Sequence, residues 1–469
     1  MIMKTKTVKR IISLLVLVLF GITSLFGMTY EELFDNYCKQ DIQYEELAIS
    51  YKQAELSYEQ SLIENGLKVT VSSGNVKMEF AENQVKTSFS PSLSVTVPSL
   101  SNTEAKISVP VSVDNENVTV QNAGVSLSAD IISSTKADRD LNSQKSLRSL
   151  EEAERKIRTK IISLEKSFLN ELKSLYSLEL SVSEAESNLL SKQNSFESVK
   201  LQGYSENSSK YRSAQLSVRS SEYDLEKAIR NYENSLESFL TACNAEGLDI
   251  NSLKIPETTL LSITDFPMEK FSTIESAVWS NYVNSTSRNN KKDFTLSANT
   301  SANVSTGRTS EDPLTTTIGA GLTAAYKGLS GNVNLSLPTS DNSNPSVTFS
   351  LSWNPIKDKT SAISKQTAEL QEQQEALSLK KAYQEYEKKV DDLETQRKTL
   401  LWQYEKNLEE ASMYKELEAD TEYWYKQGIV SESEYQSAKT NYAKAQLAVI
   451  SSKIEQLIYN LDLQSLFVE

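Results

Sequence analysis

The 469-residue sequence has no histidine and only two cysteines. Because histidine is missing, the chain lacks both the commonest general base and the commonest zinc ligand. Cys38 and Cys243 are too few for a disulfide scaffold and too isolated in the sequence for a metal site. They could pair with each other in an oxidising compartment, and the alternative of two unrelated buried thiols stays open.

Recognisable catalytic motifs are also missing. The sequence contains no P-loop, no nucleophile elbow and no Cys/His cluster. Acidic pairs such as Asp391-Asp392 are typical of solvated helix faces. We therefore expect no catalytic residue, no metal and no cofactor, and the sequence does not favour an enzyme.

Long apolar runs are scarce as well. One short run, from Ile11 to about Leu19, follows four basic residues and leads through small residues to Gly27. This layout is typical of a secretory signal peptide, with a membrane anchor as the alternative, so we expect cleavage of residues 1–27. The net charge of −14 then becomes −18, because the removed segment carries four positive and no negative residues. Such acidity argues against nucleic acid as a partner.

The rest of the sequence alternates twice between two patterns, and its hydrophobic content of 38% suffices for a sizeable core. Helical periodicity over residues 29–65 is followed by strand-like alternation over residues 66–131. Helical periodicity returns from Ala137 to about Leu240, with a break at Gly203. The apolar seam before this break predicts a helix of about 60 residues.

The second half repeats this order, which indicates an internal duplication. We expect a first repeat over residues 28–245, a linker over residues 246–268 and a second repeat over residues 269–469. In the second repeat the sequence predicts a short helix from Phe271 to about Tyr282 and a β segment over residues 292–354. Two helices follow, from Ala362 to about Tyr425 and from about Ser433 to Leu466. Few residues separate Tyr282 from the β segment, so the ascending helix of this half is expected to be missing or very short.

The strand-like segments have one apolar and one polar face. In "SVTFSLSW" the residues Val347, Phe349, Leu351 and Trp353 alternate with Ser and Thr. Strands of about 9 to 11 residues with this pattern can cross an outer membrane, and Trp353 and Phe294 near strand ends fit an aromatic girdle. A soluble β-sandwich alternates equally well and stays open. Strands in lipid leave no open edge, so the membrane alternative requires closure and implies an oligomer.

Two stretches carry a resemblance to a known family. "YKQGIVSESEYQSAKTNYAKAQLAV" has a Tyr-x-x-Gly turn followed by a helix with small residues, and "LSWNPIKDKTSAISKQTAELQEQQEAL" has a Pro between a strand and a long helix. Together with the order of elements, they resemble the TolC-type outer membrane efflux proteins. The resemblance implies a mixed, mainly α fold. Long antiparallel helical hairpins form a periplasmic α-barrel, and amphipathic strands contribute to a shared outer-membrane β-barrel. Each β segment is long enough for four strands where the family has two.

The resemblance also implies where function resides. The helix tips at Gly203, Tyr425 and Gly428 would dock a periplasmic adaptor. Glu432 and Glu434 would form the periplasmic aperture as a ring of carboxylates from three chains. Glu434 matches an acidic position of the family, whereas the next position, one helical turn on, is Ser437. A solvated first helical turn is the alternative role for these glutamates.

The expected function is an outer-membrane channel that serves as the exit duct of a tripartite efflux or type I secretion system. Such a homotrimer would contact outer-membrane lipid, would extend its helices into the periplasm, and would work passively with an adaptor and an inner-membrane pump. The alternative is a periplasmic coiled-coil adaptor or structural spacer without a membrane barrel.

Overall fold

The computed structural model describes most of the chain after residue 28. The described residues are 29–81, 84–114, 117–120, 123–245, 250, 253–305, 315–339 and 344–468. The expected signal peptide, residues 1–27, lies outside them. The chain divides into two compact units that each combine distant stretches. Unit 1 comprises the described part of Met1–Glu45 with Thr159–Asp265 and Asp392–Ser465, and unit 2 comprises Glu46–Arg158, Phe266–Asp391 and Leu466–Glu469.

Unit 1 is helical. It contains α2 (Tyr30–Lys39), α5 (Ser209–Ala242), α8 (Glu432–Ser465), the short 3₁₀ turn η2 (Ile263–Asp265), and parts of α3 (Ile42–Glu64), α4 (Thr135–Leu201) and α7 (Pro355–Lys426). Its core surrounds Phe168, which is fully buried. The rings of Tyr30, Phe34, Tyr37 and Phe239 lie between 5.4 and 5.6 Å from the Phe168 ring. Aromatic packing therefore joins α2, α4 and α5.

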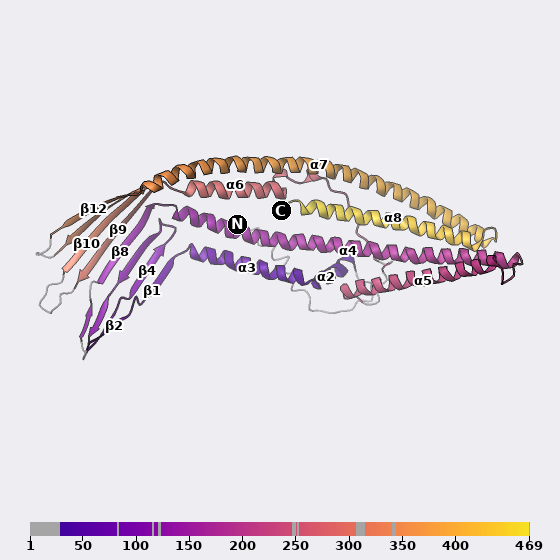
Figure 1. Cartoon of the computed structure of the whole chain (residues 1–469), viewed down its shortest axis with the longest axis horizontal. Helices are drawn as coiled ribbons and strands as arrows, with labels where there is room; N and C mark the ends of the chain where they lie inside the picture. Colours follow the sequence, from indigo (N-terminus) through magenta and orange to yellow (C-terminus); the bar gives the residue numbers. More distant parts are fainter. Residues whose placement is uncertain are drawn as a thin grey trace. The chain divides into compact units, whose positions relative to one another are not determined.

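Unit 2 contains the remaining parts of α3, α4 and α7, the 3₁₀ turn η3 (Met268–Lys270), α6 (Ser272–Asn290) and all the strands (Figure 1). The first β segment forms β1 (Lys68–Ser72), β2 (Lys77–Ala81), β3 (Gln84–Phe89), β4 (Ser92–Val97), β5 (Thr103–Ser108), β6 (Val111–Asp114), β7 (Asn117–Val120) and β8 (Ala123–Ile132). The second segment forms β9 (Phe294–Ser305), β10 (Thr315–Tyr326), β11 (Leu329–Pro338) and β12 (Ser346–Trp353). The second segment thus has the four strands that its length suggested, whereas the first segment has eight shorter ones.

The strands form two antiparallel sheets. The larger sheet has eight strands in the order β1-β4-β5-β8-β9-β10-β11-β12, and the smaller sheet has the order β2-β3-β6-β7. Consecutive segments such as β3 and β4 pass from one sheet to the other across a short break that contains Pro91. Proline has no amide hydrogen to donate, so a ladder of hydrogen bonds is easily interrupted there. Pro110 stands at the corresponding break between β5 and β6.

The helices agree with the sequence prediction with one correction. The long helices are present as α4 with 67 residues and α7 with 72 residues. The ascending helix of the second half is not missing, because α6 has 19 residues against 23 in α3. Its polar end has low helix propensity, but Arg288 forms a bidentate ion pair with Glu375 and Asn290 donates a hydrogen bond to Asp138. These tertiary contacts stabilise a helical end that propensity alone would not.

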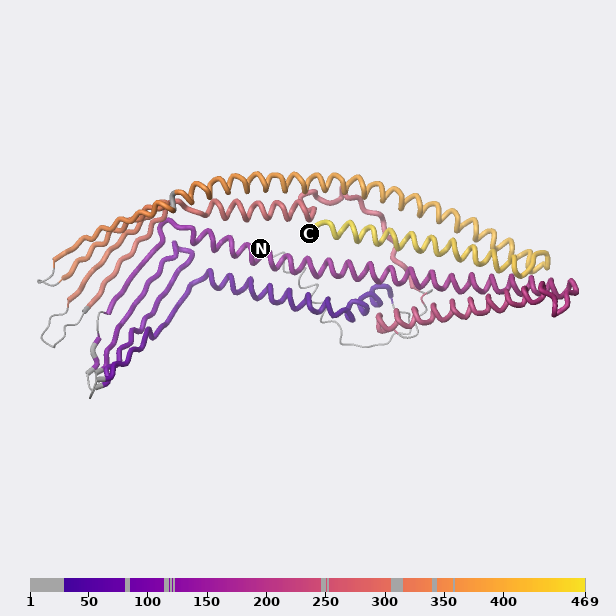
Figure 2. Tube along the Cα trace, viewed as in Figure 1, coloured from indigo at the N-terminus to yellow at the C-terminus, as the bar shows by residue number. Residues whose placement is uncertain are grey.

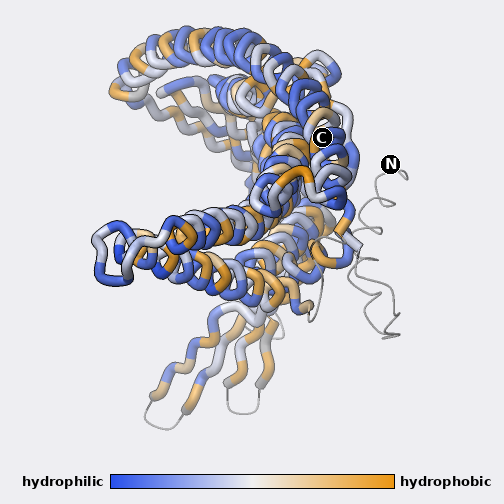
Figure 3. Tube along the Cα trace, turned by 90° about the vertical axis from the view of Figure 1, so that its right-hand side faces the viewer, coloured by the Kyte–Doolittle hydropathy of each residue, from blue (hydrophilic) through white to orange (hydrophobic). Residues whose placement is uncertain are grey.

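Apolar and polar residues alternate along the helices (Figure 3). Among the residues that the structure describes, no helix is long and apolar enough to cross a membrane.

Candidate functional site

The register of the eight-stranded sheet sorts its side chains into an apolar and a polar face. One cross-strand row reads Val71, Leu93, Ile107, Val125, Ala302, Ile318 and Leu337. A neighbouring row of opposite orientation reads Thr70, Ser94, Lys106, Ser126, Ser301, Gly319, Ser336 and Ser346. Because side chains alternate along every strand, these rows lie on opposite faces. The sheet is therefore amphipathic across both β segments.

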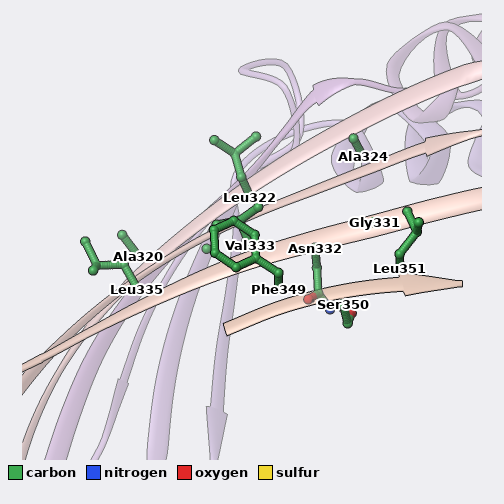
Figure 4. A pocket seen from close by; sticks show the side chains of 11 residues that line it. Ala320, Leu322, Ala324, Gly331, Asn332, Val333, Leu335, Phe349, Ser350 and Leu351 are labelled. Atoms are coloured by element: carbon green, nitrogen blue, oxygen red, sulfur yellow. Dashed lines mark hydrogen bonds between the residues drawn. The ribbon is translucent and has the colours of Figure 1, made fainter. Parts of the chain in front are cut away.

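The apolar face is largely uncovered by the residues that the structure describes. Val71 is 81% exposed, Phe349 is 73% exposed and Leu351 is 77% exposed. A hollow of about 820 Å³ lies on the sheet over β10, β11 and β12, and Leu322, Val333 and Phe349 meet in it across the three strands (Figure 4). A contiguous exposed apolar surface of this kind marks contact with a protein or a membrane.

Aromatic residues mark the end of this face next to the helices. Tyr326 on β10 lies opposite Phe294 on β9 and Leu329 on β11, and Leu329 lies opposite Trp353 on β12. The four residues therefore occupy one row across β9 to β12. The two aromatic residues expected near strand ends are thus brought into one row. Sequence reasoning missed Tyr326, although its place at the end of an alternating segment was visible.

The two helix tips in unit 1 end in the same way. Gly203 has a φ of +77° and Gly428 a φ of +71°, the left-handed conformation that closes a helix at low cost only for glycine. At the second tip the amide of Gly428 donates to the carbonyl of Tyr425, and the amide of Ile429 donates to that of Trp424, which is a Schellman motif. Figure 2 shows that α7 and α8, joined by this turn, run side by side.

The next helix begins with a capping box. The Ser431 hydroxyl accepts a hydrogen bond from the Glu434 amide at 3.3 Å, and the Ser431 amide and hydroxyl both donate to the Glu434 carboxylate at 2.8 and 2.9 Å. These bonds lower the pKa of Glu434, the backbone amide contributing most. The Ser-x-x-Glu spacing of such a cap is visible in the sequence. At the first tip Ser208 caps α5 through the amide of Tyr211.

An aromatic pair closes each tip, which sequence reasoning also missed. The rings of Tyr425 and Tyr435 stack at 5.2 Å, and those of Phe196 and Tyr211 meet edge to face at 5.0 Å. Each pair connects the helix that ends at the glycine with the helix that starts after it. Glu432, Glu434 and Ser437 are all exposed on the first turns of α8. Their assembly into an aperture is a proposal that needs further copies of the chain.

Replacing Gly428 by alanine is expected to destabilise this tip by about 1 kcal/mol, because a β-carbon disfavours the left-handed conformation. Among the described residues no atom lies within 4 Å of an added β-carbon, so we expect the cost to come from backbone strain. Gly428→Asn is the matched control, since asparagine tolerates this conformation better. Hydrogen exchange at the last turn of α7 measures the difference, and equal exchange in the two variants would contradict the expectation.

The two cysteines are buried in unit 1 and are free thiols in the structure. Burial, followed by nearby carboxylates such as Asp35 for Cys38 and Glu171 for Cys243, raises the pKa of each thiol to about 12. Thiols with such a pKa are protonated at neutral pH and therefore react slowly. The pairing of Cys38 with Cys243 stays a prediction.

A solved outer membrane channel structure shares this fold. The chain is similar to the open state of the MtrE outer membrane channel of Neisseria gonorrhoeae, with 14% identity, a TM-score of 0.51, and coverage of 93% of this chain and 88% of that chain. It also aligns with the CmeC outer membrane channel of Campylobacter jejuni, with 14% identity, a TM-score of 0.44, and coverage of 97% and 91%. At this identity the likeness establishes the fold, and the resemblance to TolC-type channels is confirmed at that level.

Two protein-family models also match the chain. Residues 33–263 match the TP096X N-terminal domain, and residues 256–469 match the TP096X C-terminal domain. The chain therefore carries the two TP096X domains in tandem. It is also 28% identical over 280 residues to an uncharacterized protein of Treponema pallidum (strain Nichols), an alignment that covers 58% of this chain. The aligned part spans half the length of that relative.

Proposed function

We propose that this protein forms a channel in the outer membrane, a passive exit duct for cargo delivered by an inner-membrane pump. The observation that carries the proposal is the sorting of apolar and polar residues onto opposite faces in register across all eight strands of the larger sheet. An apolar face suits lipid, whereas a face of serine, threonine, asparagine and glycine suits a water-filled interior. The similarity of the fold to that of a solved outer membrane channel supports the same assignment.

The length of two strands of the larger sheet also supports a membrane location. β9 and β10 each have 12 residues, which spans the hydrocarbon region at a tilt near 45°. The row of Phe294, Tyr326 and Trp353 would then lie at the interface on the side of the helices, where aromatic rings are favoured. In this proposal the helices extend into the periplasm.

The remaining parts of the proposal concern partners. We propose a homotrimer, built from chains with two structural repeats, that docks a periplasmic adaptor at the tips around Gly203, Tyr425 and Gly428. Exposed apolar side chains near these turns, including Leu201 and Ile429, offer contact area for such a partner. A soluble spacer or adaptor, the alternative function, would leave the apolar face of the larger sheet in water, which is unfavourable.

Planar bilayers test the proposal directly. Detergent-solubilised protein is expected to run as trimer-sized particles and to give discrete conductance steps after reconstitution. A monomer that stays soluble without detergent and gives no conductance would overturn the channel and favour the spacer.

Changing Glu434 to glutamine tests the proposed aperture. Three carboxylates in a ring bind multivalent cations, so the variant should weaken the block of conductance by such cations. Glutamine keeps the side-chain acceptor for the Ser431 amide, which preserves the cap. Ser437→Ala, one turn further on, is the control without a change of charge. An unchanged block in Glu434→Gln would exclude this residue from the aperture.

A further inference from the structure

The hollow on the apolar face of the larger sheet exists because two small residues meet there. Ala324 on β10 lies directly opposite Gly331 on β11. The same cross-strand row continues to Leu296 on one side and to Leu351 on the other, so two small residues stand between two leucines (Figure 4). The volume of about 820 Å³ falls within the range of about 300 to 1,000 Å³ that small-molecule sites occupy.

Gly331 leaves this space open although its backbone does not require glycine. Its φ lies outside the left-handed region. Among the described residues, a β-carbon built on Gly331 would meet Cδ1 of Leu351 at 3.5 Å and the carbonyl oxygen of Ser350 at 3.6 Å, which are ordinary contacts. On the polar face, by contrast, a β-carbon on Gly321 would lie 2.2 Å from Oδ1 of Asn299. A neighbouring side chain thus fills the space at Gly321, whereas the space at Gly331 stays open.

The surroundings of the hollow suit hydrocarbon. Among the described residues, no charged side chain lines it, and the strands β9 to β12 contain no charged residue. Thr300 on the same face donates its hydroxyl hydrogen to the carbonyl of Gly319 at 3.1 Å, so this polar group has a partner within the sheet. Such a surface is unfavourable in water and carries little penalty in lipid.

The strand ends next to the helices carry positive charge. Lys291 and Lys292 precede β9 and Lys327 follows β10, whereas Asp293 is the one acidic residue in these two segments. The Lys327 ammonium lies 5.3 Å from the centre of the Tyr326 ring. Lys327 has a φ of +51°, a left-handed conformation that suits asparagine and glycine better. The turn therefore presents a lysine at a cost in local stability.

The cation and the hollow follow one another along the same face. Tyr326, which carries Lys327 over its ring, and Ala324 are two residues apart on β10, about 7 Å at a rise of about 3.4 Å per residue. A molecule with an anionic group at one end and a hydrocarbon chain at the other matches both features. Phospholipids have this composition, and their phosphates lie at the level where aromatic and basic side chains gather.

We propose that this face binds one phospholipid of the periplasmic leaflet, with its phosphate beside Lys327 and one acyl chain in the hollow over Ala324 and Gly331. The inference rests on the proposed membrane function and names a lipid partner for its apolar face. A lipid is the occupant that fits, because the hollow continues the surface proposed to face the membrane and a cation stands at the end where head groups would lie.

Lipid titration followed by native mass spectrometry tests the seat of the acyl chain. Gly331→Leu and Ala324→Leu fill the hollow from two different strands. Each is expected to lower the affinity of detergent-solubilised protein for phosphatidylglycerol about tenfold, the effect of about two methylene groups losing their contacts. Ala302→Leu is the matched control, because Ala302 is exposed on the same face outside the hollow. Circular dichroism verifies that each variant keeps its strands.

The possible results separate this inference from the proposed function. If the filled variants bind phosphatidylglycerol as tightly as the wild type, the lipid seat is overturned. If filling the hollow changes the mass of the assembly and not the number of bound lipids, a second copy covers it and the lipid is excluded. Conductance steps in these variants would leave the channel intact in either case. Wild-type protein with neither conductance nor membrane association would instead remove the proposed function.

Lys327→Gln tests the phosphate contact. The variant is expected to weaken binding of phosphatidylglycerol about fivefold, because one lysine near a lipid phosphate loses its charge. Binding of diacylglycerol, which has the chains without the phosphate, should not change. Lys106→Gln removes the same charge from the polar face and is the control. Unchanged binding in Lys327→Gln would overturn the phosphate contact, and glycerol phosphate binding as tightly as the lipid would show a site for free phosphate and overturn the lipid.

Discussion

Phe168→Ala is expected to lower the free energy of unfolding of unit 1 by about 4 kcal/mol. The side chain is fully buried, and four aromatic rings from α2, α4 and α5 surround it. Removing the ring forfeits its transfer free energy and leaves a cavity that these rings can fill only in part. The same change frees α2 and α5 from their common contact on α4.

Urea unfolding followed by helical circular dichroism measures this effect. The matched control is Leu216→Ala on α5, whose side chain is 71% exposed and should cost less than about 0.5 kcal/mol. A loss below about 1.5 kcal/mol for Phe168→Ala would show that the cluster repacks easily and does not anchor unit 1.

Glu275→Gln is expected to lower the stability of unit 2 by about 3 kcal/mol. Arg148, only 6% exposed, forms a bidentate ion pair with Glu275, with its Nη2 atom 2.6 Å from the carboxylate. Arg155 adds two bonds of 3.2 and 3.3 Å to the same group. The variant removes the bidentate partner of a buried guanidinium and leaves the half-exposed Glu152, whose Oε1 lies 2.9 Å from the Arg148 Nε atom, as an acidic neighbour. Weakening a buried ion pair costs more than the loss of an exposed pair.

The pH dependence gives a second check on this ion pair. Burial alone would raise the pKa of Glu275, but hydrogen bonds from Arg148 and Arg155 outweigh it and hold the pKa below its usual value of 4.5. Its stabilising contribution is therefore complete above about pH 4.5 and is lost as the pH falls through the lower folded-state pKa. The difference in unfolding free energy between wild type and Glu275→Gln should shrink in that acid range. A difference that does not change with pH would contradict the assignment.

The faces of the sheet and the positions of the helix tips could be predicted from sequence because both depend on local signals. Alternation along "SVTFSLSW" defines which side chains share a face, whatever the strand pairs with. Gly428 and Ser431 act within their own turns, so the end of α7 and the start of α8 were readable.

The features that sequence reasoning missed depend on distant contacts or on competing roles. The length of α6 depends on Arg288 finding Glu375 on another helix. The aromatic pair of Tyr425 and Tyr435 forms only once the chain has reversed. Glu434 was interpreted as an aperture residue, whereas its carboxylate also caps α8. The same residue type at this position fits both roles, so the sequence does not decide between them.

The exposed apolar repeat on α7 was overlooked for a different reason. A seven-residue repeat such as Ile356, Ile363 and Leu370 looks like core, but all three side chains are exposed among the residues that the structure describes. Periodicity predicts that a partner helix is needed, but it does not say whether that helix belongs to the same chain.

The breaks that separate the two sheets have a consequence for motion. The first β segment passes between the two sheets with breaks between β1 and β2, β3 and β4, and β5 and β6. Hydrogen bonding in the small sheet therefore does not continue through the ladders of the large one. Its amide hydrogens should exchange with solvent as a separate group and faster than those of β9 to β11, so that one end of the strands can open and close while the rest keeps its pairing.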